Sequence, residues 1–359
     1  MINEIKVSGY KSIKESEIKL NNLNILTGTN GSGKTNFLSI FKFLNHIINE
    51  NLQKTVMLSG GADNFLYYGR EITNKITIKI EFGTSKYHIE LSPTRDILII
   101  DKEVLTSTSP NNSPSDILFT KNELESNFRR ETLLRPGKIA DQMLDAMKDW
   151  KIYHFHDTSA NSPIRSTTKI NDLNYFNDDG SNLASYLYFL KQHHPQNYLL
   201  IEKSIQLAAP YFDKFKLEPN LSNKKMIYLK WLSKGFDQQM SIDDFSDGTL
   251  RFICYATLLQ QPQEFIPQTL IIDEPELGLH PKALELLASM IKSLSKQKQV
   301  LVSTQSVEFI NYFDIEDLIV VDRDNTDSKF KRLEYEKFEK LLEEYSVGDL
   351  WNKNLLGGR

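Results

Sequence analysis

One short stretch near the start of the sequence has the residue types and spacing that bind phosphate. The pattern G-x-x-x-x-G-K-[ST] is matched by Gly28, Thr29, Asn30, Gly31, Ser32, Gly33, Lys34 and Thr35. Glycines let successive backbone N–H groups converge on phosphate oxygens, and a helix N-terminus adds a favourable dipole. Lys34 would place its charge at the β and γ phosphates, and the Thr35 hydroxyl would bind Mg²⁺. With Asn36, the stretch predicts a nucleoside triphosphate site; the alternative is a chance glycine-rich turn.

Two adjacent carboxylates much later in the chain supply a second candidate site. The apolar run that begins at Thr269 has the pattern of a buried strand and ends in Asp273 and Glu274. Asp273 would hold Mg²⁺, directly or through water, and Glu274 would polarise the water that attacks the γ-phosphate. The alternative is a strand that simply ends in two acids. A glutamate directly after the aspartate favours hydrolysis over nucleotide storage.

Strands and helices must position these residues, and the hydrophobic pattern predicts them. Residues 23–26 read as a strand that ends at Gly28, and an apolar stripe with helical spacing predicts a helix from about Lys34. Residues 75–104 predict an antiparallel meander. From Met226 onward strands alternate with helices, which implies a mainly parallel sheet covered on both faces.

The middle of the chain has a different character. Residues 106–116 are a polar tract rich in Ser, Pro and Asn, for which we expect a mobile loop. From about 121 to 215 the pattern predicts a compact helical insertion. We therefore divide the chain into an N-terminal half of the fold (1–105), a loop and helical insertion (106–225) and a C-terminal half (226–359).

A third motif connects the first two to a known class of proteins. The turn Ser246, Asp247 and Gly248 precedes a predicted helix and lies shortly before the acidic strand. Alone it would only cap a helix. In this order the three motifs resemble the ATPase heads of the SMC and RecF class, among the ABC-type AAA ATPases related to the OLD proteins. The resemblance covers roughly residues 1–70 and 240–359, and it implies an α/β P-loop NTPase fold with an antiparallel β lobe and a helical insertion.

The resemblance also implies roles for individual residues. In this class the turn at 246–248 is the signature motif, which completes the γ-phosphate site of a partner subunit, and residues 275–281 match the D-loop. Many relatives carry histidine where this chain has Gln305, an amide that can hydrogen-bond phosphate or water but cannot carry a proton. In RecF-like heads a residue near Lys11 or Ser12 approaches the nucleotide; the alternative for this segment is an exposed hairpin. The closing stretch DLWNKNLLGGR is similar to family C-termini without an assigned role.

Composition excludes several classes of protein. The 359 residues include 43 Lys and Arg against 47 Asp and Glu, a formal net charge of −4, which argues against a strongly basic nucleic-acid coat but leaves room for a local basic stripe. The single cysteine, Cys254, cannot form an intramolecular disulfide, which suits a reducing compartment. No run approaches the roughly 20 apolar residues of a membrane helix. We expect a cytoplasmic protein with no membrane partner.

Two other groups of residues invite functional interpretations. His154 and His156 have strand spacing and could hold a metal, but a packed pair is favoured because no third ligand is in view. The best local basic cluster comprises Arg129, Arg130, Arg135 and Lys138. It could contact nucleic acid, and the alternative is a solvated helix face.

The function implied by the resemblance is ATP-dependent, Mg²⁺-dependent head-to-tail dimerisation, with hydrolysis reopening the homodimer or a higher oligomer. Two biological roles remain open. One is DNA-linked action in repair or phage defence, with nucleic acid as partner. The other is a regulatory ATPase scaffold that controls a separately encoded effector, a nuclease or a toxin. A transporter subunit, a small-molecule kinase and a catalytically dead scaffold are less favoured.

Overall fold

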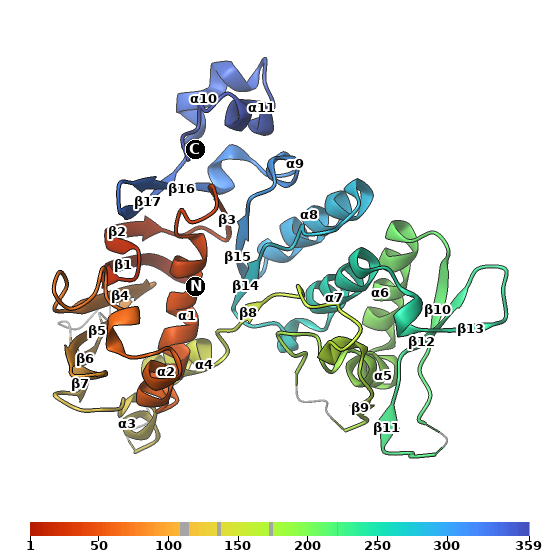
Figure 1. Cartoon of the computed structure of the whole chain (residues 1–359), viewed down its shortest axis with the longest axis horizontal. Helices are drawn as coiled ribbons and strands as arrows, with labels where there is room; N and C mark the ends of the chain where they lie inside the picture. Colours follow the sequence, from red (N-terminus) through yellow and green to blue (C-terminus); the bar gives the residue numbers. More distant parts are fainter. Residues whose placement is uncertain (108–114, 135–137, 172–174, 221, 359) are drawn as a thin grey trace. The chain divides into compact units, whose positions relative to one another are not determined.

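The computed structural model describes residues 1–107, 115–134, 138–171, 175–220 and 222–358, and its contacts divide the chain into two units (Figure 1). The first unit comprises Met1–Ile152, Pro267–Ile271 and Lys298–Arg359. The second comprises Tyr153–Ile266 and Ile272–Gln297. The chain therefore passes from one unit to the other within a single strand, after Ile271.

An antiparallel sheet of six strands forms the lobe of the first unit, in the order β2-β1-β4-β5-β6-β7. Its strands are β1 (Ile2–Tyr10), β2 (Ile13–Lys19), β4 (Ile76–Phe82), β5 (Ser85–Thr94), β6 (Ile97–Ser107) and β7 (Ser115–Thr120). Alternation places Ile76, Ile78 and Ile80 in the core while Lys79 is exposed. The predicted meander at 75–104 is confirmed.

The polar tract at 106–116 is only partly described by the structure. Residues 108–114 of the predicted mobile loop lie outside the described residues. At its ends the prediction is wrong, because Thr106 and Ser107 belong to β6 and pair with Asp116 and Ser115 of β7. Backbone hydrogen bonds to a neighbouring strand extend the hairpin past its last apolar residues, and a search for apolar alternation cannot detect this.

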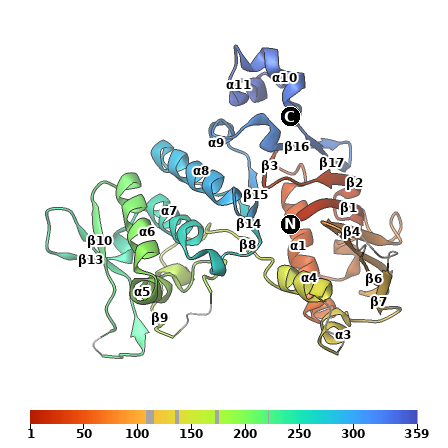
Figure 2. The same cartoon turned by 180° about the vertical axis from the view of Figure 1, so that it is seen from behind.

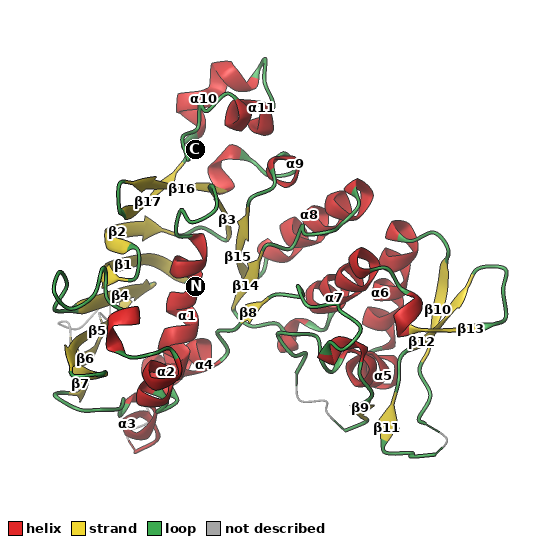
Figure 3. Ribbon diagram, viewed as in Figure 1, coloured by secondary structure: helices red, strands yellow, loops and turns green. Residues whose placement is uncertain are grey.

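A second sheet, mainly parallel in its centre, has the order β17-β16-β3-β15-β14-β8 (yellow arrows in Figure 3). Its strands are β3 (Leu23–Thr27), β8 (Ile152–Tyr153), β14 (Thr269–Asp273), β15 (Gln299–Thr304), β16 (Leu318–Asp324) and β17 (Asp327–Arg332). The central strand β3 is buried along its whole length and pairs in parallel with both β15 and β16. The edge strand β17 runs antiparallel to β16.

Helix α1 (Lys34–Ile48) joins the cores of these two sheets. One hydrophobic cluster contains Phe37, Phe41 and Leu44 of α1 together with Ile78 of the lobe and Leu301 of β15. Figure 2 shows α1 beside the strands, together with α4 (Lys138–Lys148). The helices α2 (Leu52–Leu58) and α3 (Phe128–Leu134) complete this part of the unit. The helix predicted from about Lys34 is confirmed.

The last part of the first unit follows β15. It contains α9 (Val307–Ile310), α10 (Tyr335–Leu342) and α11 (Val347–Asn352). The N-terminus of α11 is held by Asn311, whose Oδ1 accepts the Gly348 N–H at 2.6 Å. After α11 the chain turns through Gly357 and Gly358, which have φ of 83° and 86°.

The second unit is mainly helical. Its helices are α5 (Leu183–His193), α6 (Pro195–Ala208), α7 (Asp247–Gln260) and α8 (Pro281–Ser295), and its strands are β9 (Thr168–Lys169), β10 (Phe212–Lys216), β11 (Met226–Ile227), β12 (Lys230–Ser233) and β13 (Gln239–Ser241). The core side of α7 buries Leu250, Ile253 and Cys254 completely. The helical stretch between 121 and 215 is thus divided, because α3 and α4 lie in the first unit. Among the described residues, every helix is too short or too polar to cross a bilayer.

Candidate functional site

The glycine-rich loop connects β3 to α1, as the sequence predicts. Gly28 follows β3 directly, and a Cβ there would collide with the carbonyl oxygen of Val321 on β16. Gly31 and Gly33 have φ of 76° and 115°, a region that side chains other than glycine rarely adopt. At Gly33 a Cβ would also collide with the hydroxyl of Ser328. The glycines are therefore needed for close packing as well as for conformation.

The ammonium group of Lys34 closes the loop from within. The Lys34 side chain is buried at 5% exposure, and Nζ donates to the carbonyl oxygens of Gly28 at 2.7 Å and Thr29 at 2.9 Å. Asn30, Gly31 and Thr35 are exposed, whereas Ser32 is buried. A compact loop with a cation at its centre is the arrangement that receives a phosphate group.

The N-terminus of α1 also fits a phosphate group. Within the residues that the structure describes, Gly33 caps α1 without any side-chain hydrogen bond, and the first turn carries no acidic residue. The first N–H groups of a helix need partners from outside the helix. Phosphate oxygens would supply them, so the residues present fit a bound nucleotide.

Segments far along the chain support the loop from outside. Arg323, just after the buried part of β16, donates from Nη1 to the Gly31 carbonyl at 3.3 Å. The Thr29 N–H donates to the carbonyl of Gly358 at 3.3 Å. This contact ties the closing stretch of unassigned role to the second residue of the loop. Sequence reasoning missed Arg323 altogether, and it noted the closing stretch without assigning it a contact with the loop.

The turn between β1 and β2 reaches the start of α1. Ser12 Oγ accepts from Asn36 Nδ2 at 2.7 Å and from Ser328 Oγ at 2.8 Å. Lys11, which has φ of 49°, donates instead to Ser39 Oγ at 3.0 Å. Of the two residues expected near the nucleotide, Ser12 is the one that contacts a residue of the predicted site.

Gln305 follows β15, the strand beside β3. The register pairs Thr304 with Thr27, so Gln305 and Gly28 leave neighbouring strands at the same end of the sheet. Gln305 is partly buried and precedes Ser306, the N-cap of α9. In parallel sheets ligands bind at this carboxyl edge.

Asp273 is the last residue of β14 and Glu274 follows it, both in the second unit. Glu274 has φ of 44°, in the left-handed region, although it is not glycine. Backbone strain of this kind concentrates at functional sites, where the surrounding structure maintains it. The Asp273 carbonyl oxygen lies 3.3 Å from Nε2 of His156, so His156 packs against the end of β14.

Ser246 is the N-cap of α7, as its position before the predicted helix suggests. Its hydroxyl accepts the Thr249 N–H at 3.2 Å and lies 2.9 Å from Thr249 Oγ1. A small cavity of about 90 Å³ beside it is lined by Ser246, Gly248, Thr249, Gly278, His280 and neighbouring apolar residues. A Cβ on Gly248 would collide with the carbonyl oxygen of Gly278. The turn at 246–248 and residues 275–281 are therefore in backbone contact within one unit.

Arg251, one turn into α7, fastens that contact. Its guanidinium donates to the carbonyl oxygens of Leu277 at 3.0 Å, His156 at 2.9 Å and Phe155 at 3.2 Å. Arg251 therefore joins the signature helix to the D-loop and to the segment after β8. No pattern in the sequence indicates this role, because the three carbonyl partners lie 26 to 96 positions away.

The structure places the histidine pair after β8 and part of the basic cluster on α3 and α4. The rings of His154 and His156 lie 5.7 Å apart, and no group of three metal-ligating side chains occurs among the described residues. Arg129 and Arg130 are exposed on α3, and Lys138 begins α4. Arg135 lies outside the described residues.

The chain is similar in sequence to a described protein family and to two curated proteins. The profile of a protein family described as "AAA domain, putative AbiEii toxin, Type IV TA system" matches residues 23–311. The chain is 22% identical over 346 residues to the Septu protein PtuA of Bacillus thuringiensis, covering 89% of this chain and 76% of that protein. It is 21% identical over 339 residues to a protein of Helicobacter pylori named ATP/GTP phosphatase, covering 88% of each.

Solved structures of SMC heads share the fold. A structure of the SmcHead bound to the C-winged helix domain of ScpA matches 94% of this chain and 99% of that chain, with a TM-score of 0.62 and 17% identity. An Smc head domain with an extended coiled coil, bound to the C-terminal domain of ScpA derived from Pyrococcus furiosus, matches 96% and 98%, with a TM-score of 0.55 and 16% identity. The predicted fold class, an α/β P-loop head with an antiparallel lobe, is confirmed.

Proposed function

The chain belongs to the AAA-domain family whose profile it matches and is an ATP-binding, ATP-hydrolysing protein with an SMC-like head fold, and we propose that it works by joining two copies on ATP. The observation that carries the proposal is the division of the predicted site. The glycine-rich loop lies in the first unit, and the signature turn, packed on the D-loop, lies in the second. Each copy would offer its loop to one ATP and its signature turn to the other.

Binding would begin at the loop. The N–H groups of Gly31, Ser32 and Gly33 and the first turn of α1 would hold the β and γ phosphates. Lys34 would exchange its two carbonyl partners for phosphate oxygens. Thr35 and Asp273 are the residues that would hold Mg²⁺, which supplies charge stabilisation to the leaving phosphates when it is bound.

Hydrolysis would use the strained glutamate. Glu274 would accept a proton from the attacking water, and its left-handed backbone would fix the direction in which the carboxylate points. Gln305 would orient the water or a γ-phosphate oxygen through its amide. Ser246 and Gly248 of the other copy would donate to the γ-phosphate, so hydrolysis would remove the contact that holds the two copies together.

Light scattering on the Glu274→Gln protein tests this cycle directly. The amide keeps the shape of the side chain but cannot accept the proton, so ATP should remain bound and turnover should fall by about 100-fold or more. We expect the molar mass to double when Mg-ATP is added. A mass that stays at the monomer while ATP binds would refute the ATP-driven homodimer, and turnover equal to wild type would remove Glu274 from its role.

The biological setting we propose is DNA-linked phage defence, which the similarity to the Septu protein PtuA supports. The competing proposal is a regulatory ATPase that restrains a separately encoded effector. It is supported by the family description, which includes a toxin of a type IV system. Salt-sensitive DNA binding by the isolated protein would favour the first. Stable co-purification with the product of a neighbouring gene, without DNA affinity, would favour the second.

A further inference from the structure

A carboxylate occupies the middle of the signature turn, where its negative charge would oppose the binding of a phosphate. Asp247 is the first residue of α7, and its side chain is 61% exposed. In the proposed dimer the turn approaches the triphosphate of the other copy. An ionised carboxylate there would repel the γ-phosphate, because like charges at close range interact strongly once water is excluded.

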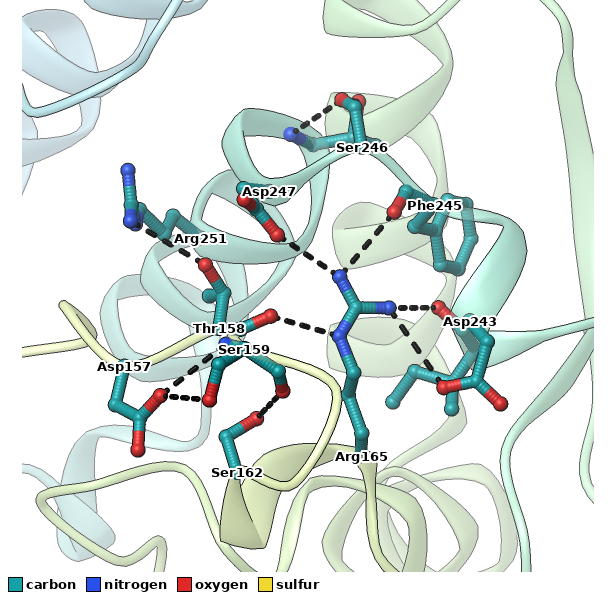
Figure 4. A network of polar contacts seen from close by, with 12 residues as sticks. Asp157, Thr158, Ser159, Ser162, Arg165, Asp243, Phe245, Ser246, Asp247 and Arg251 are labelled. Carbon is teal, nitrogen blue, oxygen red and sulfur yellow. Dashed lines mark hydrogen bonds and ion pairs between the residues drawn. The ribbon is translucent and has the colours of Figure 1, made fainter.

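Arg165 pairs with this carboxylate from within the second unit. Its Nη2 lies 3.0 Å from Asp247 Oδ1, and its side chain is only 8% exposed. The short 3-10 turn Pro163–Arg165 carries it. Figure 4 shows the guanidinium between Asp247 and the segment around Thr158, pointing at the start of α7.

The other donors of Arg165 fix the guanidinium in place. Nε donates to the Thr158 carbonyl at 2.8 Å, Nη1 donates to the Ile242 carbonyl at 2.8 Å and Nη2 donates to the Phe245 carbonyl at 3.3 Å. A nearby acid, Asp243, lies 3.9 Å from Nη1. The cation is therefore positioned by backbone groups before and beside the signature turn, and it does not depend on Asp247 for its location.

We propose that Arg165 is a positioning residue for ATP-driven dimerisation: it holds the Asp247 carboxylate as an ion pair, so that the signature turn meets the partner's triphosphate with N–H and hydroxyl donors. This inference rests on the proposed dimer and deepens it. It explains how a turn with aspartate at its centre can serve as a γ-phosphate site. Arg165 acts through Asp247 and does not itself touch the nucleotide.

The competing interpretation is that Arg165 only stabilises the fold through its three carbonyl bonds. The two interpretations differ in what a second substitution does. If the role is electrostatic, removing the charge of Asp247 should compensate for the loss of Arg165. If the role is only structural, Asp247→Asn cannot replace the bonds to Thr158, Ile242 and Phe245.

The test uses full-length chains that all carry Glu274→Gln, so that ATP is not consumed. We would measure the dissociation constant of the Mg-ATP dimer by sedimentation for Arg165→Ala, for Arg165→Gln and for each combined with Asp247→Asn. Arg165→Gln keeps an amide donor without the charge, so a folded uncharged variant is available if the alanine protein unfolds. Tyr228→Phe is the matched control, because it removes the 2.6 Å hydrogen bond to the neighbouring Asp243 and leaves Asp247 untouched.

We expect the uncharged Arg165 variants to weaken the dimer at least tenfold and Asp247→Asn to restore most of the loss. Tyr228→Phe should stay within about twofold of the parent, and ATP binding by the monomer should be unchanged in every variant because the loop lies in the other unit. A dimer that is equally weak with and without Asp247→Asn would overturn the proposal. If the parent Glu274→Gln protein does not dimerise on ATP, the dimer itself is wrong, which is a different result.

Discussion

Lys34 illustrates how one residue type decides the chemistry of a site. Its ammonium group lies almost fully buried, on two carbonyl oxygens of its own loop. A bound triphosphate would place negative charge beside this buried ammonium group and so stabilise it. The loop is therefore prepared for an anion, and the lysine provides much of the attraction.

At this scale the clearest prediction concerns Lys34→Ala. Without the ammonium group we expect the affinity for Mg-ATP to fall by about 100-fold or more, because charge-assisted bonds to phosphate are lost. Calorimetric titration measures it. Lys42→Ala, an exposed lysine on the same helix, is the control and should bind as wild type does. Equal affinity for both variants would contradict the assigned role.

Residues that act within a short stretch could be predicted, and residues that act across the chain could not. The loop, the two carboxylates and the signature turn are contiguous motifs, and the structure places each at the predicted end of a strand or start of a helix. Arg165 and Arg251 bond to backbone carbonyls as many as 80 and 96 positions away. Any residue offers a carbonyl group, so no side-chain type marks such partners in a sequence.

Among the elements, the antiparallel lobe contains an unusual buried acid. Glu103 on β6 is fully buried and accepts hydrogen bonds from Tyr87 at 2.7 Å, Thr120 at 2.6 Å and Ser126 at 2.8 Å. Burial raises the pKa of Glu103 above its ordinary value of 4.5, although the three hydroxyl groups act in the opposite direction. The lobe therefore favours the protonated carboxyl more than the unfolded chain does.

This shift predicts how the stability of the lobe depends on pH. A raised folded-state pKa contributes stability that is fully present below 4.5 and is lost as the pH rises through the folded-state pKa. Relative to Glu103→Gln, which does not titrate, the wild type should gain unfolding free energy as the pH falls from about 7 toward 5. Urea denaturation at both pH values measures this difference. If the difference in unfolding free energy between the two proteins is the same at both pH values, the pKa of Glu103 does not change on folding.

The sequence predicts the presence of helices and strands better than it predicts the residues at which they end. The helices that start at Lys34, Asp247 and Pro281 begin where a glycine, a capping serine or a proline marks them. The hairpin of β6 and β7 extends into a polar tract, because its ladder depends on backbone groups that every residue carries. Local patterns therefore indicate where a helix starts more reliably than where a strand stops.

For the whole molecule, the important feature is that the loop and the signature turn belong to different units. In a symmetric pair of copies each ATP would be enclosed by the loop of one chain and the turn of the other. A defect in the loop and a defect in the turn should then complement each other when they lie on different chains. Gly248→Ala supplies the second defect, since its Cβ would displace the turn from Gly278.

We predict that mixing Lys34→Ala with Gly248→Ala, each inactive alone, restores ATP turnover. An equal mixture should reach about a quarter of the wild-type rate, because about half of the pairs are mixed and each holds one complete site. Steady-state phosphate release measures it. The control is the protein that carries both substitutions on every chain, which should give no turnover. Failure of the mixture to exceed its components would contradict the sharing of each ATP between the loop of one chain and the turn of the other.

Cys254, a buried residue of α7, makes it simple to label the protein and follow the association of two copies. The thiol has no exposure, and burial raises its pKa well above the ordinary value, so little of it is present as the reactive thiolate. It is also the only cysteine in the sequence. A cysteine substituted for an exposed residue of α8 would therefore take up a maleimide dye at one defined place, and Cys254 would not need to be replaced. Energy transfer from a donor dye on one copy to an acceptor dye on the other would report the closing and reopening of the dimer in real time.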